Sequence, residues 1–562
     1  MRRLAILSIT AVISIVIGFV ASYFIFMHFF NLDIRKNILL NEHKSSEDGS
    51  LKLPKEDKNQ DESSDKIPLR VKSEFLPEKF KMKWEISKDV KPEKNFSRDY
   101  DIAFGSSDEF SELNGVTCFR GNNYRNSPGF GYADIREEKL EPLWSNKISY
   151  IDIWTGVGWT GQPAIVQWND SVRKIMNITP DKKSKKGLKE VIYATLDGNI
   201  YFYDLEDGVP TRAPIRVGYP HKGSLSIDPR GYPLLYAGQG IEQVAGKPVP
   251  IGYRIYSLID QKLLHFIDGY DPFALRKWAA FDSNCLIDKN TDTFIECGEN
   301  GVLYSGKLNT KFDLNKKSIS IHPELVKYRY TTAKSTQLGT ENSPAIYKNY
   351  IYFADNSGIL QCVDLKTLKP VWVRYLNDDT DSTTVLEEIS DSEVYLYTAC
   401  EVDKQGNNGS SYVRKINALT GELLWEKSYP CFYDTSTNGG TLASPVIGKH
   451  EIENLVIFNI AKTGTKTGGK LIAFDKKSGK EVWVKNLKYY CWSSPVDVYT
   501  KDGKAYLIIC DSGGLMSLLD AKTGKTLHEI PLEANIEGSP AVYDDIVVVG
   551  TRGQKIWGIK IK

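Results

Sequence analysis

Short runs of apolar residues, each about the length of a β-strand, recur along the chain from near residue 139 to its end. In residues 343–375 four such runs follow one another, and turn residues such as Asn356-Ser357-Gly358 separate them. Apolar runs of this length that are bounded by turn residues are typical of strands. The segment therefore predicts a four-stranded antiparallel unit that opens on Ser343-Pro344.

The same unit returns about every 45 to 60 residues, which is the spacing of a repeat architecture. Eight copies begin near residues 161, 224, 281, 343, 394, 443, 493 and 538. A small sheet of this kind buries its faces only against neighbouring copies, and closing the series into a ring removes the exposed ends. We therefore predict an all-β fold, an eight-bladed β-propeller of four-stranded antiparallel blades over residues 139–562.

The eighth copy stops after three strands, at Lys562. We expect residues 140–145, LEPLWS, to supply the missing strand, because their Leu-Trp pair resembles Leu424-Trp425 and Val482-Trp483. Such a splice would place both ends of the propeller in one blade and lock the ring.

One repeat carries a recognisable motif. Residues 473–483, AFDKKSGKEVW, resemble the A-x-D-x-x-T-G-K-x-x-W docking motif of quinoprotein (PQQ-type) propeller repeats, and residues 417–425 and 364–372 resemble degraded copies of it. Phe119-Arg120-Gly121-Asn122 resembles the lead-in segment of PQQ-like propellers of the BamB type. The resemblance covers about residues 115–562. It implies that the tryptophan of one blade packs on the next blade, and it is more specific for fold than for activity.

The N-terminal part of the chain has a different character. Residues 4–30 contain no acidic or basic residue except His28, and the stretch exceeds the roughly 20 residues that cross a bilayer. Because Arg2 and Arg3 precede it, we predict that residues 1–30 form a transmembrane signal anchor with a cytoplasmic N-terminus and an extracytoplasmic propeller.

Residues 31–70 are rich in charged side chains and poor in large apolar ones, so we expect a disordered charged linker. Residues 71–138 form an N-terminal extension and a candidate cap for one mouth of the propeller channel. Within this extension, residues 80–84 are a candidate short strand.

Charge and cysteine content narrow the function classes. Lys and Arg number 72 against 71 Asp and Glu, so no strong positive field favours nucleic acid as a partner. The eight cysteines include no C-x-x-C motif. Cys285 and Cys297 lie symmetrically about residue 291, and two interpretations stay open: a disulfide across a hairpin, or two buried thiols.

In a propeller, the residues just before each inner strand gather at one mouth of the channel. This placement predicts a ligand-binding funnel formed by the side chains of Trp159, Gln162, Glu341, Asn342, Thr441, Trp492 and Glu537. The alternative interpretation is that these side chains only satisfy backbone groups where the inner strands begin.

A second candidate site follows the spacing of a calcium loop. Asp288, Asn290, Asp292 and Glu299 offer oxygen ligands at suitable intervals, but Thr293 stands where the sharp turn of such a loop requires glycine. The same residues also suit an ordinary hairpin tip between the first two strands of the third blade.

These observations favour a membrane-anchored extracytoplasmic module that binds or scaffolds a protein or a glycan, with no catalytic residues and no cofactor. The alternative is an exported PQQ-dependent dehydrogenase that oxidises an alcohol or a sugar and uses PQQ with Ca²⁺. The family pattern for that activity includes two adjacent cysteines, and this sequence contains no such pair.

Overall fold

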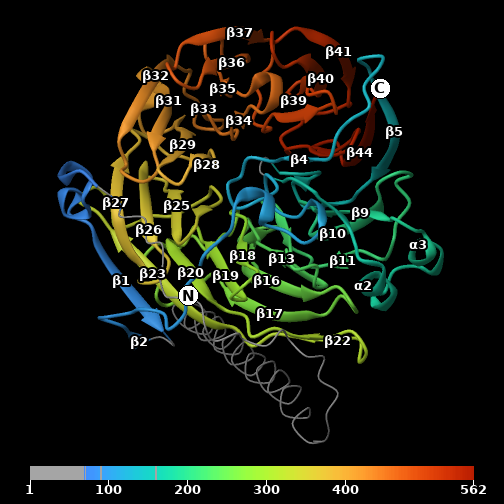
Figure 1. The fold of residues 1–562 in the computed structure, drawn as a ribbon, viewed down its shortest axis with the longest axis horizontal. Helices are drawn as coiled ribbons and strands as arrows, with labels where there is room; N and C mark the ends of the chain where they lie inside the picture. The colour runs from blue at the N-terminus through green and yellow to red at the C-terminus, as the bar shows by residue number, and fades with distance from the viewer. Residues whose placement is uncertain (1–68, 70, 89–90, 159–160) are drawn as a thin grey trace, which may run out of the picture. The chain divides into compact units, whose positions relative to one another are not determined.

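Eight sheets follow one another in chain order around a central axis (Figure 1), and their repeat strands pair antiparallel. The computed structural model describes residue 69 and residues 71–88, 91–158 and 161–562. The predicted eight-bladed β-propeller is confirmed. The predicted anchor, residues 1–30, lies outside the described residues, as does almost all of the predicted linker. In the part of the chain that is described, no helix is long and apolar enough to cross a bilayer.

Blades 2, 4, 5 and 7 are four-stranded sheets, as predicted. Their strands, from the first to the outermost, are β12 (Leu225–Ile227), β13 (Leu234–Ala237), β16 (Gly252–Ser257) and β17 (Leu263–Asp268) in blade 2; β24 (Ala345–Tyr347), β25 (Tyr350–Ala354), β26 (Ile359–Asp364) and β27 (Lys369–Tyr375) in blade 4; β28 (Val385–Ser390), β29 (Glu393–Ala399), β31 (Ser410–Asn417) and β32 (Leu423–Pro430) in blade 5; and β38 (Val496–Tyr499), β39 (Ala505–Cys510), β40 (Leu515–Asp520) and β41 (Thr526–Pro531) in blade 7.

The other four blades carry added strands, so the prediction of four strands in every blade is wrong for them. The physical reason is that a sheet edge presents unpaired backbone groups, which nearby segments can cover. The strands are β3 (Asn114–Val116), β8 (Ala164–Gln167), β9 (Lys189–Ala194), β10 (Asn199–Asp204) and β11 (Ile215–Arg216) in blade 1; β18 (Leu286–Asp288), β19 (Thr293–Cys297), β20 (Val302–Lys307), β23 (Glu324–Thr331), β1 (Lys83–Lys88) and β2 (Lys91–Pro92) in blade 3; β30 (Glu401–Val402), β33 (Gly439–Gly440), β34 (Val446–Ile447), β35 (Leu455–Ala461), β36 (Gly469–Asp475) and β37 (Glu481–Leu487) in blade 6; and β4 (Gly129–Phe130), β42 (Ala541–Tyr543), β43 (Ile546–Thr551), β44 (Lys555–Ile561) and β5 (Leu140–Lys147) in blade 8.

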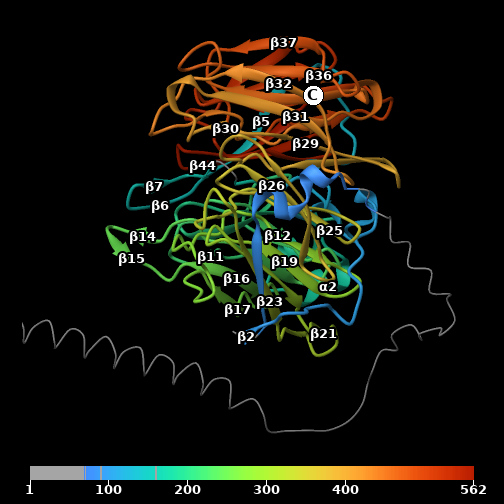
Figure 2. The same ribbon diagram turned by 90° about the vertical axis from the view of Figure 1, so that its left-hand side faces the viewer.

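Smaller elements decorate the ring, and the hairpins β6–β7 and β14–β15 lie on the same side of it (Figure 2). These elements are β6 (Tyr150–Ile151), β7 (Trp154–Thr155), β14 (Gln243–Val244), β15 (Lys247–Pro248), β21 (Lys311–Asp313), β22 (Ser318–Ser320), the helices α2 (Asp170–Ile175) and α3 (Pro180–Ser184), and the 3-10 turns η1 (Ser73–Phe75), η2 (Pro77–Phe80), η3 (Ser107–Glu109), η4 (Gly406–Asn408) and η5 (His450–Ile452).

The ring closes within blade 8. Strand β5 pairs antiparallel with β44, so that Leu140 lies opposite Ile561 and Ser145 lies opposite Trp557. The predicted splice of residues 140–145 into the last blade is confirmed. It fixes the two ends of the propeller through backbone hydrogen bonds.

A repeated tryptophan contact joins neighbouring blades. The indole Nε1 of Trp372 donates to the carbonyl of Ala418, 2.8 Å away, and a Cβ on Gly421 would meet the Trp372 ring at 3.0 Å. The glycine has φ 75°, so both its backbone conformation and its close contact exclude a side chain. Equivalent pairs are Trp144 with Gly208, Trp425 with Gly479, and Trp483 with Gly524. This is the packing that the motif resemblance implies.

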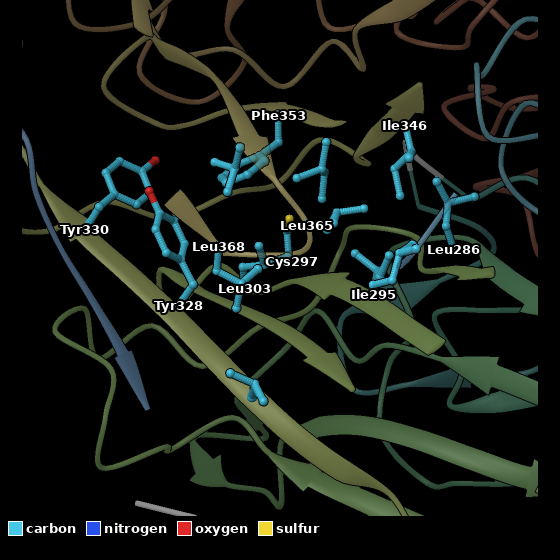
Figure 3. Close-up of a cluster of buried hydrophobic side chains, with 14 of the residues drawn as sticks. Leu286, Ile295, Cys297, Leu303, Tyr328, Tyr330, Ile346, Phe353, Leu365 and Leu368 are labelled. Carbon is cyan, nitrogen blue, oxygen red and sulfur yellow. The ribbon is translucent and has the colours of Figure 1, made fainter. Parts of the chain in front are cut away.

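Apolar side chains fill the space between consecutive blades. Between blades 3 and 4, the side chains of Leu286, Ile295 and Ile346 are fully buried, and Tyr328 and Phe353 belong to the same cluster (Figure 3). Met82 and Ile86, from the segment that precedes the ring, pack into this cluster as well. The N-terminal extension therefore contributes to the core of blade 3.

Two finer sequence predictions need correction. The fifth copy was expected to begin near residue 394, but its first strand is β28, which begins at Val385. The disulfide interpretation of Cys285 and Cys297 is also wrong. Strands β18 and β19 pair Asp288 with Thr293, so the two cysteines are offset by one residue and belong to different buried clusters. All eight cysteines are buried free thiols.

Candidate functional site

A ring of hydrogen bonds surrounds the axis where the inner strands begin. The backbone N–H of Ser343 donates to the hydroxyl of Thr383 in the next blade, 2.9 Å away. The same donation joins Gln162 to Ser224, Asn284 to Ser343, Ser444 to Ser494, and Ser494 to Ser539, at 2.9–3.1 Å. The serine of each Ser-Pro pair therefore links two neighbouring blades through a hydrogen bond.

The segment around Phe119 to Asn126 fills the channel inside this ring, where the blue to teal chain crosses the middle of Figure 1. The guanidinium of Arg120 donates to the carbonyls of Pro445 and Pro495, at 2.6 and 2.9 Å. Arg125 donates to the carbonyl of Pro344, at 2.8 Å, and both arginines are fully buried. Since a guanidinium offers five donors, carbonyls from several blades are the acceptors that such burial requires. We call residues 119–126 the plug.

Charged residues form a second ring around the axis. Each of them lies two positions earlier in the sequence than a residue of the hydrogen-bonded ring. Lys222, Asp282, Glu341 and Asp381 occupy this position in blades 2 to 5, and Glu537 occupies it in blade 8. A cavity of about 10 Å³ lies between the plug and these groups, lined by Phe119, Asp282, Glu341 and Asp381 among others. Its volume is close to that of one water-sized sphere.

Two of the predicted funnel residues, Gln162 and Asn342, satisfy backbone groups, as the alternative interpretation describes. Gln162 accepts from the Arg120 N–H at 2.7 Å and donates to the carbonyl of Pro540 at 2.8 Å. The Asn342 amide donates to the carbonyls of Ala354 and Thr380. The Thr441 hydroxyl lies 3.0 Å from the hydroxyl of Ser411. Trp159 lies outside the described residues.

The other predicted funnel residues lie on the charged ring or its equivalent position. The ammonium of Lys222 lies 3.4 Å from the Glu341 carboxylate and 2.5 Å from that of Asp282. Trp492 packs near Tyr490, with 5.4 Å between ring centroids. Glu537 accepts a hydrogen bond from Asn535 at 2.8 Å.

Acidic side chains gather around Glu341 into what we call the carboxylate cluster: Asp282, Glu299, Glu341, Asp379, Asp381, Glu401 and Asp403. Burial raises the pKa of Asp379 to about 7 and raises the pKa values of Glu299 and Asp381 well above the ordinary range. Burial acts on Glu341 in the same direction, but the Lys222 ammonium brings the pKa of Glu341 below its ordinary value. The cluster therefore combines protonated and ionised carboxyl groups near neutral pH.

The structure does not gather the predicted calcium-loop residues at one point. Asp288 accepts from the Asn290 N–H at 3.2 Å, as in a hairpin tip, and Asp292 pairs with Arg230 at 2.5 Å. Glu299 lies beyond the far end of β19 and belongs to the carboxylate cluster. The residues between β18 and β19 form the hairpin that was the alternative interpretation.

Sequence reasoning missed most of the carboxylate cluster. Asp282, Asp381 and Lys222 precede copies that lack the Ser-Pro pair, namely those with Asn284-Cys285, Thr383-Thr384 and Ser224-Leu225. The signal that could have found them is a charged residue two positions before the residue that aligns with the serine of the Ser-Pro pair, whether or not that residue is serine.

Comparisons with known proteins agree on the repeat type. The family model described as outer membrane protein assembly factor BamB matches residues 467–562. The outer membrane protein assembly factor BamB of Kangiella koreensis is 24% identical over 169 residues, which cover 24% of this chain and 42% of the relative. The match thus spans less than half the length of that relative.

Solved structures with a similar fold are more distant in sequence. BamB from Moraxella catarrhalis is 13% identical, with a TM-score of 0.47, and the match covers 75% of this chain and 99% of that one. A europium-containing methanol dehydrogenase is 14% identical, with a TM-score of 0.41, over 80% of this chain and 98% of that one.

Proposed function

We propose, on the premise that this chain is a β-propeller protein of PQQ-like repeats, that it is a membrane-anchored extracytoplasmic scaffold whose blade edges bind extended segments of a partner protein. The family model described as BamB, an assembly factor by its name, is consistent with such a role. The apolar stretch of residues 4–30 supports the anchor.

The observation that carries the proposal is a strand already added to one blade edge. Strand β1 pairs antiparallel with β23, the outer repeat strand of blade 3, from Lys83 opposite Thr331 to Lys88 opposite Val326. The added strand buries Ile86 in the core between blades 3 and 4. An outer blade edge of this protein therefore accepts an extended segment through backbone pairing and an apolar anchor, which is how many peptides add to sheets.

Blade 6 offers a comparable edge. Strand β37 is the outermost strand of its sheet, and Val482 and Val484 are 53% and 42% exposed. Among the outer strands of the described residues, β37 alone exposes two large apolar side chains. Exposed strand edges of this kind template the addition of another strand. A protein segment with alternating apolar residues fits this edge better than a glycan does, because a glycan has no backbone amides to pair with it.

The competing proposal, a PQQ-dependent dehydrogenase, needs a site for a flat tricyclic cofactor. The plug and the charged ring leave a cavity of about 10 Å³ between them. This cavity is too small for a tricyclic quinone, so the enzyme would have to hold its cofactor elsewhere. Addition of PQQ and Ca²⁺ to the purified full chain tests it directly, since the enzyme requires cofactor uptake and alcohol- or sugar-dependent reduction of a dye.

Site-specific photo-crosslinking tests the scaffold. A photoreactive amino acid replaces Val484 of β37 in the full chain, expressed in its native host, and a matched probe replaces Thr331 of β23, which β1 already covers. We expect adducts with a second polypeptide from position 484 and none from position 331. Equal yields from the two positions, or none from position 484, would refute strand addition at the blade 6 edge.

The membrane anchor is tested separately. We expect the full chain to stay with the membrane fraction after alkaline washing and a chain that begins at residue 31 to be released. Release of both would contradict the anchor and leave the blade-edge proposal untouched.

A further inference from the structure

We propose that Asp379, Glu401 and Asp403 form a binding site for a hard divalent cation, represented by Ca²⁺, at the junction of blades 5 and 6. One oxygen from each of the three carboxylates lies within 4.8 Å of the others. Oxygen atoms are the ligands that Ca²⁺ prefers, and carboxylates supply the charge that such a cation requires. This inference is independent of strand addition at the blade edges.

A buried oxygen without a donor is the second observation. Asp379 is only 9% exposed, and among the described residues its Oδ1 has no hydrogen-bond partner. Buried acceptors are nearly always satisfied, and a bound ion or water is one explanation for an exception. Glu401 is 2% exposed and accepts from the Asn438 amide at Oε2, 3.0 Å away, which leaves Oε1 for a further ligand.

The backbone holds these carboxylates in place. The N–H of Glu401 donates to the carbonyl of Asp379 at 3.0 Å, so the two residues lie side by side. The carboxylate of Asp378 accepts from the N–H groups of Asp403, Lys404 and Gln405 at 2.9–3.1 Å. Since backbone contacts set these positions, a cation would meet a preformed set of ligands and not a loop that must fold around it.

Lys404 is the competitor for this position. Its ammonium lies 3.0 Å from Oδ2 of Asp379 and 3.8 Å from Oδ2 of Asp403. The Lys404 side chain is 51% exposed, so it can turn to solvent when a divalent cation enters. The competing interpretation is a simple ion-pair cluster in which Lys404 is the sole cation.

Calorimetric titration of the metal-free full chain with CaCl₂ distinguishes the two interpretations. We expect saturable binding to one site, at least tenfold weaker binding in Glu401→Gln, and severalfold tighter binding in Lys404→Met because the competing charge is removed. The matched control is Asp391→Asn, an acidic residue of blade 5 that is paired with Lys348 at 2.7 Å, and it should bind Ca²⁺ like the parent.

Because Glu401 is buried, its variant could lose the fold, so Asp403→Asn is measured beside it. Weaker binding in Asp403→Asn with an unchanged circular dichroism spectrum supports the site. Absence of saturable Ca²⁺ binding to the parent overturns the proposal. Parental affinity in a folded Asp403→Asn, or in Lys404→Met, would also overturn it, since the ion would then lie elsewhere.

Discussion

The outer strands of blades 3 and 6 are held in two different ways. Strand β23 of blade 3 has no tryptophan, and the added strand β1 covers its outer edge along six residue pairs. Strand β37 of blade 6 packs Trp483 on Gly524 of blade 7, and its indole donates to the carbonyl of Ala521 at 3.2 Å. Among the described residues, no strand pairs with the outer edge of β37.

This difference shows that two separate contacts stabilise an outer strand in this propeller. One is backbone pairing along its edge, and the other is packing of its side chains on the next blade. In blade 3, whose outer strand lacks the docking tryptophan, a segment from outside the repeats supplies both edge pairing and apolar contact. In blade 6, Trp483 fixes the outer strand on the neighbouring blade, and the strand edge stays available for another chain.

Among the changes at the outer edges of blades 3 and 6, removal of the apolar anchor of β1 should have the largest effect. Ile86 is 5% exposed in the core between blades 3 and 4, so Ile86→Ala should lower the free energy of unfolding by about 3 kcal/mol. Lys88→Ala, on the exposed end of the same strand, should change it by less than about 0.5 kcal/mol. Urea denaturation measures both changes in unfolding free energy. Equal changes would show that β1 lies on the surface and contributes no apolar anchor to the core.

Removal of the docking tryptophan should have a smaller effect at blade 6. Trp483 is partly exposed, so Trp483→Ala should cost about 2 kcal/mol, whereas Trp372→Ala, at a fully buried copy of the same contact, should cost about 4 kcal/mol. The two denaturation midpoints provide the check. A cost at Trp483 as large as that at Trp372 would contradict the expectation that the partly exposed tryptophan contact is the weaker of the two.

A buried carboxyl group makes the blade 3 contact sensitive to pH. The hydroxyl of Tyr330 on β23 donates to Asp355 of blade 4 at 2.6 Å, and burial raises the pKa of Asp355 to about 6. An acid whose folded-state pKa is raised binds more protons when folded than when unfolded. Its contribution to stability is complete below its unfolded pKa near 4 and is lost as the pH rises through 6.

Asp355→Asn should therefore remove part of the loss of stability between pH 4 and pH 7, on the order of 2 kcal/mol. The measurement is the difference in unfolding free energy between these two pH values, in the parent and in the variant. Identical differences in both proteins would show that Asp355 does not titrate in this window.

The smallest effect on stability is expected at the open edge itself. Val484→Lys should change the free energy of unfolding by less than about 0.5 kcal/mol because the side chain is exposed. It should nevertheless abolish adducts from a photoreactive probe at Val482, since a lysine on a strand edge opposes pairing. Unchanged adduct yield would show that the partner does not add as a strand.

The repeat pattern was sufficient to predict the ring and its closure, because the apolar runs, the turns and the Leu140–Trp144 copy are local in sequence. The pairing of β1 with β23 was not predictable, since it joins residues far apart and the segment carries no repeat motif. The same limit explains Cys285 and Cys297, where a register error of one residue reversed the face of a strand.

The site was predicted less completely than the fold. Glu341, Trp492 and Glu537 were found because they precede copies with Ser-Pro or its equivalent, whereas Asp282 and Asp381 precede copies that have lost it. Glu401 and Asp403 lie in and directly after β30, a strand that has no counterpart in the repeat, and Asp379 lies beside them in the segment before β28. A site that depends on such an inserted segment cannot be predicted from the repeat pattern and is found only in the structure.

Hydrogen exchange along β37 is the most direct test of the scaffold, comparing the free chain with the chain joined to its crosslinked partner. The account predicts that alternate amides of Glu481–Leu487, those that face away from β36, exchange quickly in the free chain and become protected in the complex. The amides of β23 should be protected in both states. Exchange at β37 that is the same in the free chain and in the complex would contradict strand addition as the way this propeller binds.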